Sequence, residues 1–354
     1  MPSIESFTGL TAVVTGAASG MGREIALQLA AQGCHLALCD VQLEGLQTTL
    51  ELIRQSNSSL NVTTHYCDVA NVESIISFRQ EVETLHTNGW NLLFNNAGIG
   101  GLGPFLEMPR ETFNKIFDVS FVGVVEMTRQ FLPTIVKQKI GAVINTSSIN
   151  GFWSALGPSK WPFPTPPHAP YSSAKAAIRG FTDALLMDAY QNFPHVGVVC
   201  VHPGHIGTGI ARLEFPKEGP SPVMLENLKE RIHRLGVIPK DKTIEDFTIE
   251  EMQDLLQEEF KNKAPTSAKV AAEIILNGVR NGRTRILVGE DAVVIDWLAR
   301  MFPRMIYNDS FIVTVLFPWM MGARVIGSPF GRYLYPIVMG MLGYFGVKGL
   351  RSRM

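Results

Sequence analysis

Seven short apolar runs, separated by longer segments with helical periodicity, constrain the fold of this 354-residue chain most strongly. Most of the runs are almost continuously apolar, as expected for parallel strands that helices cover on both faces. The alternation predicts an α/β fold with one doubly wound parallel sheet of about seven strands. The predicted strands are Leu10–Thr15, Cys34–Asp40, Asn61–Cys67, Asn91–Asn95, Ala142–Ser147, Val196–His202 and Arg285–Val288.

Two segments depart from this alternation. Residues 214–263 form a charged insertion before the last strand, with helical runs such as EEMQDLLQEEFKNK. They are either a helical lid or outer subdomain, or else a solvated surface excursion. Residues 301–354 form an apolar C-terminal extension. We expect residues 1–300 to be the main domain, with the insertion as part of it.

Composition excludes some classes of protein. The net charge of -1 provides no field that would attract nucleic acid. The first ten residues lack the basic start and apolar run of a secretory signal. Three of the four cysteines fall in apolar runs, which is typical of buried, reduced thiols. A protein that faces the cytosol and is not secreted is the simplest interpretation.

The stretch TAVVTGAASGMGREIA places Gly16, Gly20 and Gly22 directly after an apolar strand and at the start of a helix. Glycines allow a tight turn and a close approach of the backbone to a pyrophosphate, which the helix N-terminus can bind. The alternative is a strand–helix turn that binds nothing. In this context we predict a dinucleotide site.

Asp40 ends the second predicted strand, where an acid can accept hydrogen bonds from the two ribose hydroxyls of an adenosine. It would also repel a 2′-phosphate, and neither Val41 nor Gln42 offers a compensating positive charge. The sequence therefore predicts NAD rather than NADP. A loop aspartate that caps the next turn is the alternative.

Several motifs in order resemble those of the short-chain dehydrogenase/reductase family, over roughly residues 7–210. They are TGAASGMG, Asp68-Val69, NNAG at 95–98, NTSS at 145–148, YSSAK at 171–175 and HPGHIGT at 202–208. The resemblance implies an NAD(P)-dependent enzyme that acts on CH–OH groups and forms homodimers or homotetramers. The cofactor-binding residues that it implies are Gly16, Ser19, Gly20, Met21, Gly22, Asp40, Asp68, Val69, Asn95, Ala97, Gly98, Tyr171, Lys175, Pro203, Gly204, Ile206 and Thr208.

The YxxxK pattern occurs twice, at Tyr171 with Lys175 and at Tyr344 with Lys348. Only the first copy follows the strand of Ser148 and opens an amphipathic helix. Residues four apart share a helix face. A neighbouring ammonium group favours the phenolate. We therefore expect Tyr171 to act as general acid/base beside Lys175, with Ser148 bonded to the substrate oxygen.

Ser120 stands where the family usually carries an asparagine, in a helix distortion whose carbonyl holds a water of the proton relay. Serine can bond to its own helix backbone, so the bend can survive. A slower relay, or a cofactor-binding protein without activity, are the alternatives. Ser120 is therefore the fourth candidate catalytic residue.

The separation of Ser148 and Tyr171 is about twice the family's usual dozen residues, because the chain inserts GPSKWPFPTPPHAP. Prolines make this loop stiff and extended. We expect Trp161 and Phe163 to form an apolar wall of the substrate site, or to pack on a helix or subunit. His168, His202 and His205 are expected to be solvated or bonded to loops and not catalytic. No metal is expected.

The extension contains uncharged runs that are too short to span a bilayer and are broken by prolines. Its aromatic and basic residues, such as Trp319 and Arg324, are typical of a membrane interface. The sequence predicts a monotopic anchor, or else an arm packed on a partner subunit. An anchored enzyme would act on lipophilic substrates such as steroids, retinoids or long-chain alcohols.

Overall fold

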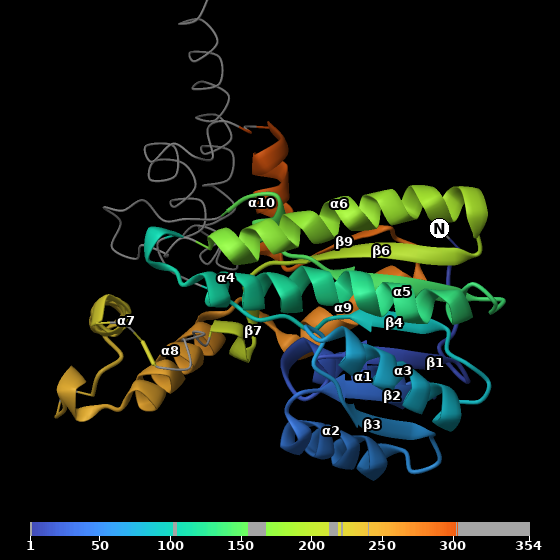
Figure 1. The fold of residues 1–354 in the computed structure, drawn as a ribbon, viewed down its shortest axis with the longest axis horizontal. Helices are drawn as coiled ribbons and strands as arrows, with labels where there is room; N and C mark the ends of the chain where they lie inside the picture. The colour runs from blue at the N-terminus through green and yellow to red at the C-terminus, as the bar shows by residue number, and fades with distance from the viewer. Residues whose placement is uncertain are drawn as a thin grey trace, which may run out of the picture. The chain divides into compact units, whose positions relative to one another are not determined.

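Seven parallel strands form one sheet, with helices on both of its faces (Figure 1). The structure, a computed structural model, describes residues 2–101, 105–154, 168–211, 219–220, 222–239, 241–301 and 303. The predicted strands agree with the observed ones to within about two residues. The strands are β1 (Thr11–Thr15), β2 (His35–Asp40), β3 (Val62–Tyr66), β4 (Leu92–Asn95), β5 (Gly141–Thr146), β6 (Val196–Pro203) and β9 (Arg285–Val288).

The strand order is β3-β2-β1-β4-β5-β6-β9, which confirms the doubly wound fold. The chain moves outward from β1 to β3 and then returns to place β4 on the other side of β1. The order therefore reverses at β1 and β4. Ligands of such sheets bind beyond the carboxyl ends of the strands at this reversal.

Alternate side chains of the strands enter two apolar cores. Val14 and Leu36 lie in one core, whereas Val13 and Ala37 lie in the other. This period of two follows from the pleat of a strand, and it explains why the strand sequences are apolar throughout. The first core contains α1 (Gly20–Ala31), α2 (Leu43–Ser56) and α9 (Ala268–Arg280), and the second contains α3 (Val72–Leu85), α5 (Gly123–Ile135) and α6 (Ala169–Asn192).

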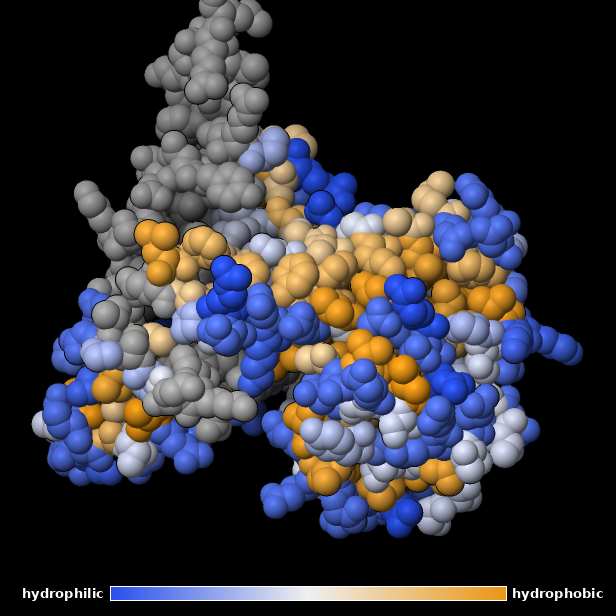
Figure 2. All heavy atoms as spheres, viewed as in Figure 1, coloured by the Kyte–Doolittle hydropathy of each residue, from blue (hydrophilic) through white to orange (hydrophobic). Residues whose placement is uncertain are grey.

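Apolar side chains gather over α5 and α6, with charged ones between them (Figure 2). Met187 is 57% exposed and Tyr190 51% exposed, both on α6. Leu132, on α5, is only partly buried. An apolar surface of this kind is typical of protein–protein contacts.

The insertion before the last strand is helical. It contains α7 (Pro222–Leu235), the short helix η5 (Ile244–Asp246) and α8 (Ile249–Lys263). These elements have an apolar core of their own, centred on Leu228, Ile232, Met252 and Leu256. A two-stranded sheet flanks the insertion, since β7 (Ile206–Gly207) precedes it and pairs with β8 (Thr266–Ser267), which follows it. The insertion therefore holds a small packed subdomain and is not merely a solvated excursion.

The chain divides into two compact units, residues 1–154 with 166–293 and residues 155–165 with 294–354. Helix α10 (Glu290–Met301) begins in the first unit. The predicted anchor lies outside the described residues. Among the helices that the structure describes, none combines the length and the apolar character needed to cross a membrane.

Candidate active site

The glycine turn lies between β1 and α1. Gly16 and Gly20 have φ values of 67° and 55°, which only glycine adopts without strain. A Cβ on Gly22 would collide with the carbonyl of Gly16. Ser19 precedes α1 without capping it through its side chain. The first amides of α1 are therefore not bonded to the capping side chain, which fits a bound pyrophosphate.

Asp40 ends β2 beside this turn. Its Oδ2 accepts a hydrogen bond from the Ala18 amide and its Oδ1 accepts one from the Gln42 amide, both at 3.0 Å. A carboxylate has about four acceptor positions, so two of them are left for hydroxyl donors. The capping role and the ribose-binding role that the sequence suggested are therefore compatible.

Asp68 and Val69 follow β3 at the same edge of the sheet. Asp68 Oδ1 accepts a hydrogen bond from the Ala70 amide at 2.9 Å, which shapes this turn. The backbone of Val69 lies against Gly123, where a Cβ would be only 2.6 Å from the Val69 carbonyl oxygen. The pair is thus held in place by the start of α5.

The NNAG segment connects the strands of the sheet. Asn95 donates hydrogen bonds to Asn145 at 2.8 Å and to Thr128 at 3.0 Å. The amides of Asn96 and Ala97 donate to Thr15 Oγ1 at 3.0 and 2.9 Å. Thr15 and Asn96 therefore fix the segment against the glycine turn. Neither residue was among the predicted site residues, although both lie within or beside the motifs.

Ser148, Tyr171 and Lys175 lie together. Ser148 precedes the short helix η3 (Ile149–Gly151), and Tyr171 and Lys175 occupy the first two turns of α6. A side-chain hydrogen bond joins Tyr171 to Ser148. Lys175 Nζ is 5.5 Å from the centroid of the Tyr171 ring and donates to the Thr146 carbonyl at 2.8 Å.

Burial controls the titration of this group. Burial raises the pKa of Tyr171 to about 12, and the hydrogen bond from Ser148 opposes that rise only in part. Burial also lowers the pKa of Lys175 to about 8. In the chain alone, desolvation outweighs the hydrogen bond from Ser148 and favours the neutral phenol of Tyr171.

Ser120 lies in a helix distortion, as expected of its position. A π-helical turn, η2 (Asp118–Val122), interrupts the helix between α4 (Arg110–Phe117) and α5. Ser120 is fully buried, and its hydroxyl donates to the Ile99 carbonyl at 3.4 Å. A Cβ on Gly98 would lie 3.3 Å from Lys175 Nζ and 3.7 Å from Ser120 Oγ. The bend has therefore survived the replacement of asparagine, close to Lys175.

The HPGHIGT segment returns from β6 to the glycine turn. The methyl group of Thr208 would be 3.2 Å from a Cβ on Gly20. Pro203 ends β6 and Ile206 begins β7. The carboxyl group of Asp291, in the first turn of α10, lies so close to Gly204 that any side chain there would collide with it.

Asp291 Oδ2 accepts a hydrogen bond from the His205 amide at 2.6 Å. Burial raises the pKa of Asp291. No sequence pattern pointed to this residue, because only the tertiary structure brings α10 to the end of β6.

The three histidines were expected to be solvated or bonded to loops, and His168 meets the second of these alternatives. His202 is fully buried in β6, with its ring 5.2 Å from that of Phe152. His205 Nε2 is 2.8 Å from the Phe260 carbonyl oxygen. His168 is partly buried and is hydrogen bonded to the Gly101 backbone. Trp161 and Phe163 lie outside the described residues.

A nicotinamide dinucleotide fits these residues. The glycine turn has no Cβ to obstruct a phosphate, and Asp40 retains acceptor capacity. The side-chain-free face of Gly98 lies beside Lys175. A Rossmann-type sheet with a Ser–Tyr–Lys group at its carboxyl edge defines a dehydrogenase that uses such a cofactor.

Comparisons with known proteins agree. The model of the short chain dehydrogenase family matches residues 10–219. SadH of Mycobacterium tuberculosis is 32% identical over 320 residues, which cover 89% of this chain and 99% of SadH. The oxidoreductase UcpA of Salmonella typhimurium is 32% identical over 226 residues, 63% of this chain and 80% of UcpA.

Among solved structures, a short-chain dehydrogenase/reductase of Burkholderia phymatum in complex with NAD has a TM-score of 0.69. It is 24% identical in sequence, and the match covers 86% of this chain and 98% of the chain from Burkholderia phymatum. The chain therefore belongs to the short-chain dehydrogenase family, and it is an NAD(P)-dependent oxidoreductase.

Proposed function

We propose that this protein is an NAD-dependent dehydrogenase that interconverts a lipophilic secondary alcohol and its ketone. The observation that carries the proposal is the meeting of Ser148, Tyr171 and Lys175 at the carboxyl edge of the sheet. The roles that follow are those that such a geometry supports.

In the oxidation, the phenolate form of Tyr171 would take the proton of the substrate hydroxyl at Oη. The electrons of the C–H bond would leave as a hydride, and uptake of that hydride is the chemistry that bound NAD would supply. Ser148 donates to the substrate oxygen and holds it near the phenol. Lys175, with a pKa of about 8, is still largely protonated at neutral pH and can stabilise the phenolate and bind the nicotinamide ribose.

Asp40 supports NAD over NADP. A 2′-phosphate placed at the free acceptor positions of this carboxylate would meet a negative charge. Arg23 lies nearby, but its guanidinium donates to Thr49 Oγ1 at 3.0 Å and to the carbonyls of Ala18 and Gly45. It is therefore engaged by the protein itself.

The apolar surface of α5 and α6 supports association of this protein with a second copy, as a dimer or tetramer. The aromatic and basic composition of residues 301–354 supports contact with a membrane surface. Residence at a membrane would favour lipophilic substrates of the steroid, retinoid or long-chain type.

The test is the Tyr171→Phe variant, which keeps the ring and removes the acid–base group. We expect NADH formation from a panel of steroid, retinoid and long-chain secondary alcohols to fall at least 100-fold, with NAD affinity little changed. Tyr190→Phe, exposed on the same helix, is the matched control and should keep wild-type turnover.

Full turnover by Tyr171→Phe would show that this tyrosine is not the acid–base group. A wild-type protein that binds NAD but oxidises no alcohol of the panel would favour the alternative of a weak or inactive cofactor-binding protein. In that case Ser120→Asn, which restores the usual residue of the family, tests whether Ser120 is the cause.

A further inference from the structure

Arg231 is a shielded cation in the helical insertion. It lies on α7 between Leu228 and Ile232, two members of the small apolar core. Its Nη1 atom is screened from solvent and has no hydrogen-bond partner in the part of the chain that the structure describes. Lys229, two residues earlier, instead lies 3.9 Å from the carboxylate of Glu245.

A guanidinium that is shielded from solvent beside an apolar core is unfavourable without a counter-ion. Burial lowers the pKa of Arg231, and no neighbouring carboxylate offsets this effect among the described residues. Arginine nevertheless stays protonated in proteins. Its five N–H groups form a planar fork that matches a carboxylate, so an anionic ligand is what would satisfy this side chain.

His168 connects Arg231 with the catalytic tyrosine. The His168 ring is 6.5 Å from the Tyr171 ring, centroid to centroid. The pKa of His168 is lowered to about 4, first by burial and then by the positive charge of Arg231. His168 is therefore neutral at physiological pH, and an imidazole offers no negative charge to a guanidinium in either protonation state. Arg231 thus carries a charge without a carboxylate partner among the described residues, near enough to His168 to act on its titration, and the His168 ring lies beside that of Tyr171.

We propose that Arg231 binds the carboxylate of a lipophilic hydroxy acid whose alcohol group lies at Tyr171. The inference rests on the proposed dehydrogenase function and narrows its substrate class. The apolar residues around Arg231 would contact the hydrocarbon part, and the guanidinium would select the acid over a neutral alcohol. In the reverse direction the same site would take the corresponding keto acid.

The test uses the full-length chain with NAD and two matched substrates, 3-hydroxydecanoate and its methyl ester. We expect wild-type kcat/KM for the acid to exceed that for the ester by about tenfold or more, as for a hydrogen bond to a charged group. Arg231→Met should abolish this preference through a higher KM for the acid, and it should leave the rate with the ester within about threefold.

Lys229→Met, which removes a charge from the same helix, is the control and should keep the preference for the acid. Equal wild-type rates with acid and ester, or equal losses for both substrates in Arg231→Met, would overturn the proposal.

If neither substrate is oxidised, calorimetric titration of the NAD complex with decanoate and with decanol tests the anion site independently of turnover. Binding of decanoate that Arg231→Met weakens at least tenfold would support the anion site even though the dehydrogenase function had failed. Absence of decanoate binding would reject the site.

Discussion

Asp40 shows how one side chain serves both the fold and the site. Its two oxygens accept the amides of Ala18 and Gln42, which ties the end of β2 to the glycine turn. The same carboxylate faces the place where an adenosine ribose binds in folds of this type. The proposed preference for NAD rests on the charge of this carboxylate.

The cofactor preference can be tested with Asp40→Asn, which removes the negative charge but keeps the size of the side chain. We expect the wild type to have a much higher kcat/KM with NAD than with NADP. The variant should use NADP about tenfold better, since the repulsion of the 2′-phosphate is lost, and NAD less well. Steady-state kinetics with both cofactors measure this.

Glu44→Gln, which neutralises an exposed acid on α2, should leave the cofactor preference unchanged. Tighter binding of NADP than of NAD by the wild type would contradict the assignment of Asp40.

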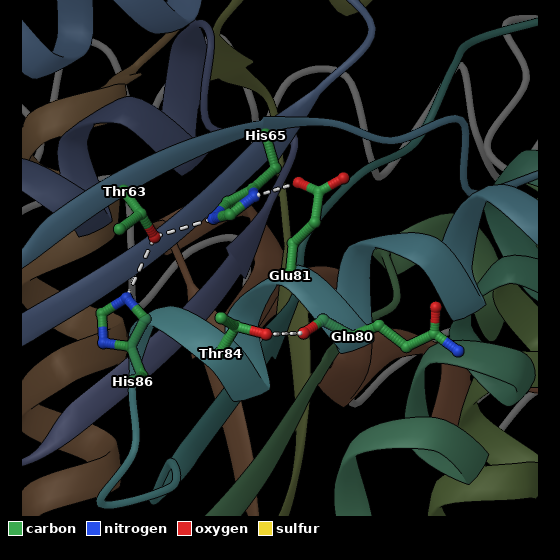
Figure 3. A network of polar contacts seen from close by, with 6 residues as sticks. All are labelled: Thr63, His65, Gln80, Glu81, Thr84 and His86. Carbon is green, nitrogen blue, oxygen red and sulfur yellow. Dashed lines mark hydrogen bonds and ion pairs between the residues drawn. The ribbon is translucent and has the colours of Figure 1, made fainter.

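At the scale of elements, a polar network joins β3 to α3 (Figure 3). Thr63 Oγ1 lies 2.7 Å from His65 Nε2 and 2.9 Å from His86 Nε2. His65 Nδ1 is 2.7 Å from Glu81 of α3, and His86 ends that helix. No group of histidine, cysteine, aspartate and glutamate side chains that could hold a metal ion occurs in the described ranges.

This network makes stability depend on pH. The pKa of His86 is lowered to about 4 by burial and then by the nearby His65 and His35. Between pH 6.5 and 4 the unfolded chain binds a proton that the folded chain refuses, so stability falls as the pH falls. The shift corresponds to a loss of about 3 kcal/mol at most.

We expect His86→Gln to lose less stability than the wild type when the pH is lowered from 7 to 5. Urea unfolding at both pH values gives the two free energies. His233→Gln, on the exposed side of α7, should keep the wild-type pH dependence. An unchanged dependence in His86→Gln would show that its imidazole is accessible to protons in the folded state.

At the scale of the whole molecule, the sheet carries the cofactor site and the additions adapt it. The insertion carries Arg231 and has its own core, which stays distinct from the two cores of the sheet. Residues 301–354 contribute the most apolar part of the chain outside the sheet.

Binding of the C-terminal extension to a membrane surface can be tested by flotation with phosphatidylserine-containing vesicles. We expect the full chain to float with the vesicles, because its aromatic and basic tail suits the interface, and a chain ending at residue 303 to stay behind. Retained NAD reduction by the shortened chain would show that the sheet is intact. A full-length protein that stays monodisperse in buffer after a salt wash would exclude the membrane anchor.

Local sequence patterns alone were enough to predict the strands of the sheet and to find the motifs of the site. Alternation of apolar runs and helices predicts all seven strands, and the order of the glycine turn, Ser148, Tyr171 and Lys175 places them at one edge. These features could be predicted because strand periodicity, glycine conformation and helix spacing are properties of short segments.

Only the tertiary structure decided the electrostatics of the site. The pKa of Tyr171, the burial of His202 and the contact of Asp291 with Gly204 depend on which distant segments surround each group. Arg231 is more than fifty residues from Tyr171 in the sequence, and nothing in its own segment marks it. Desolvation and charge act through space, so they are fixed only when the chain has folded.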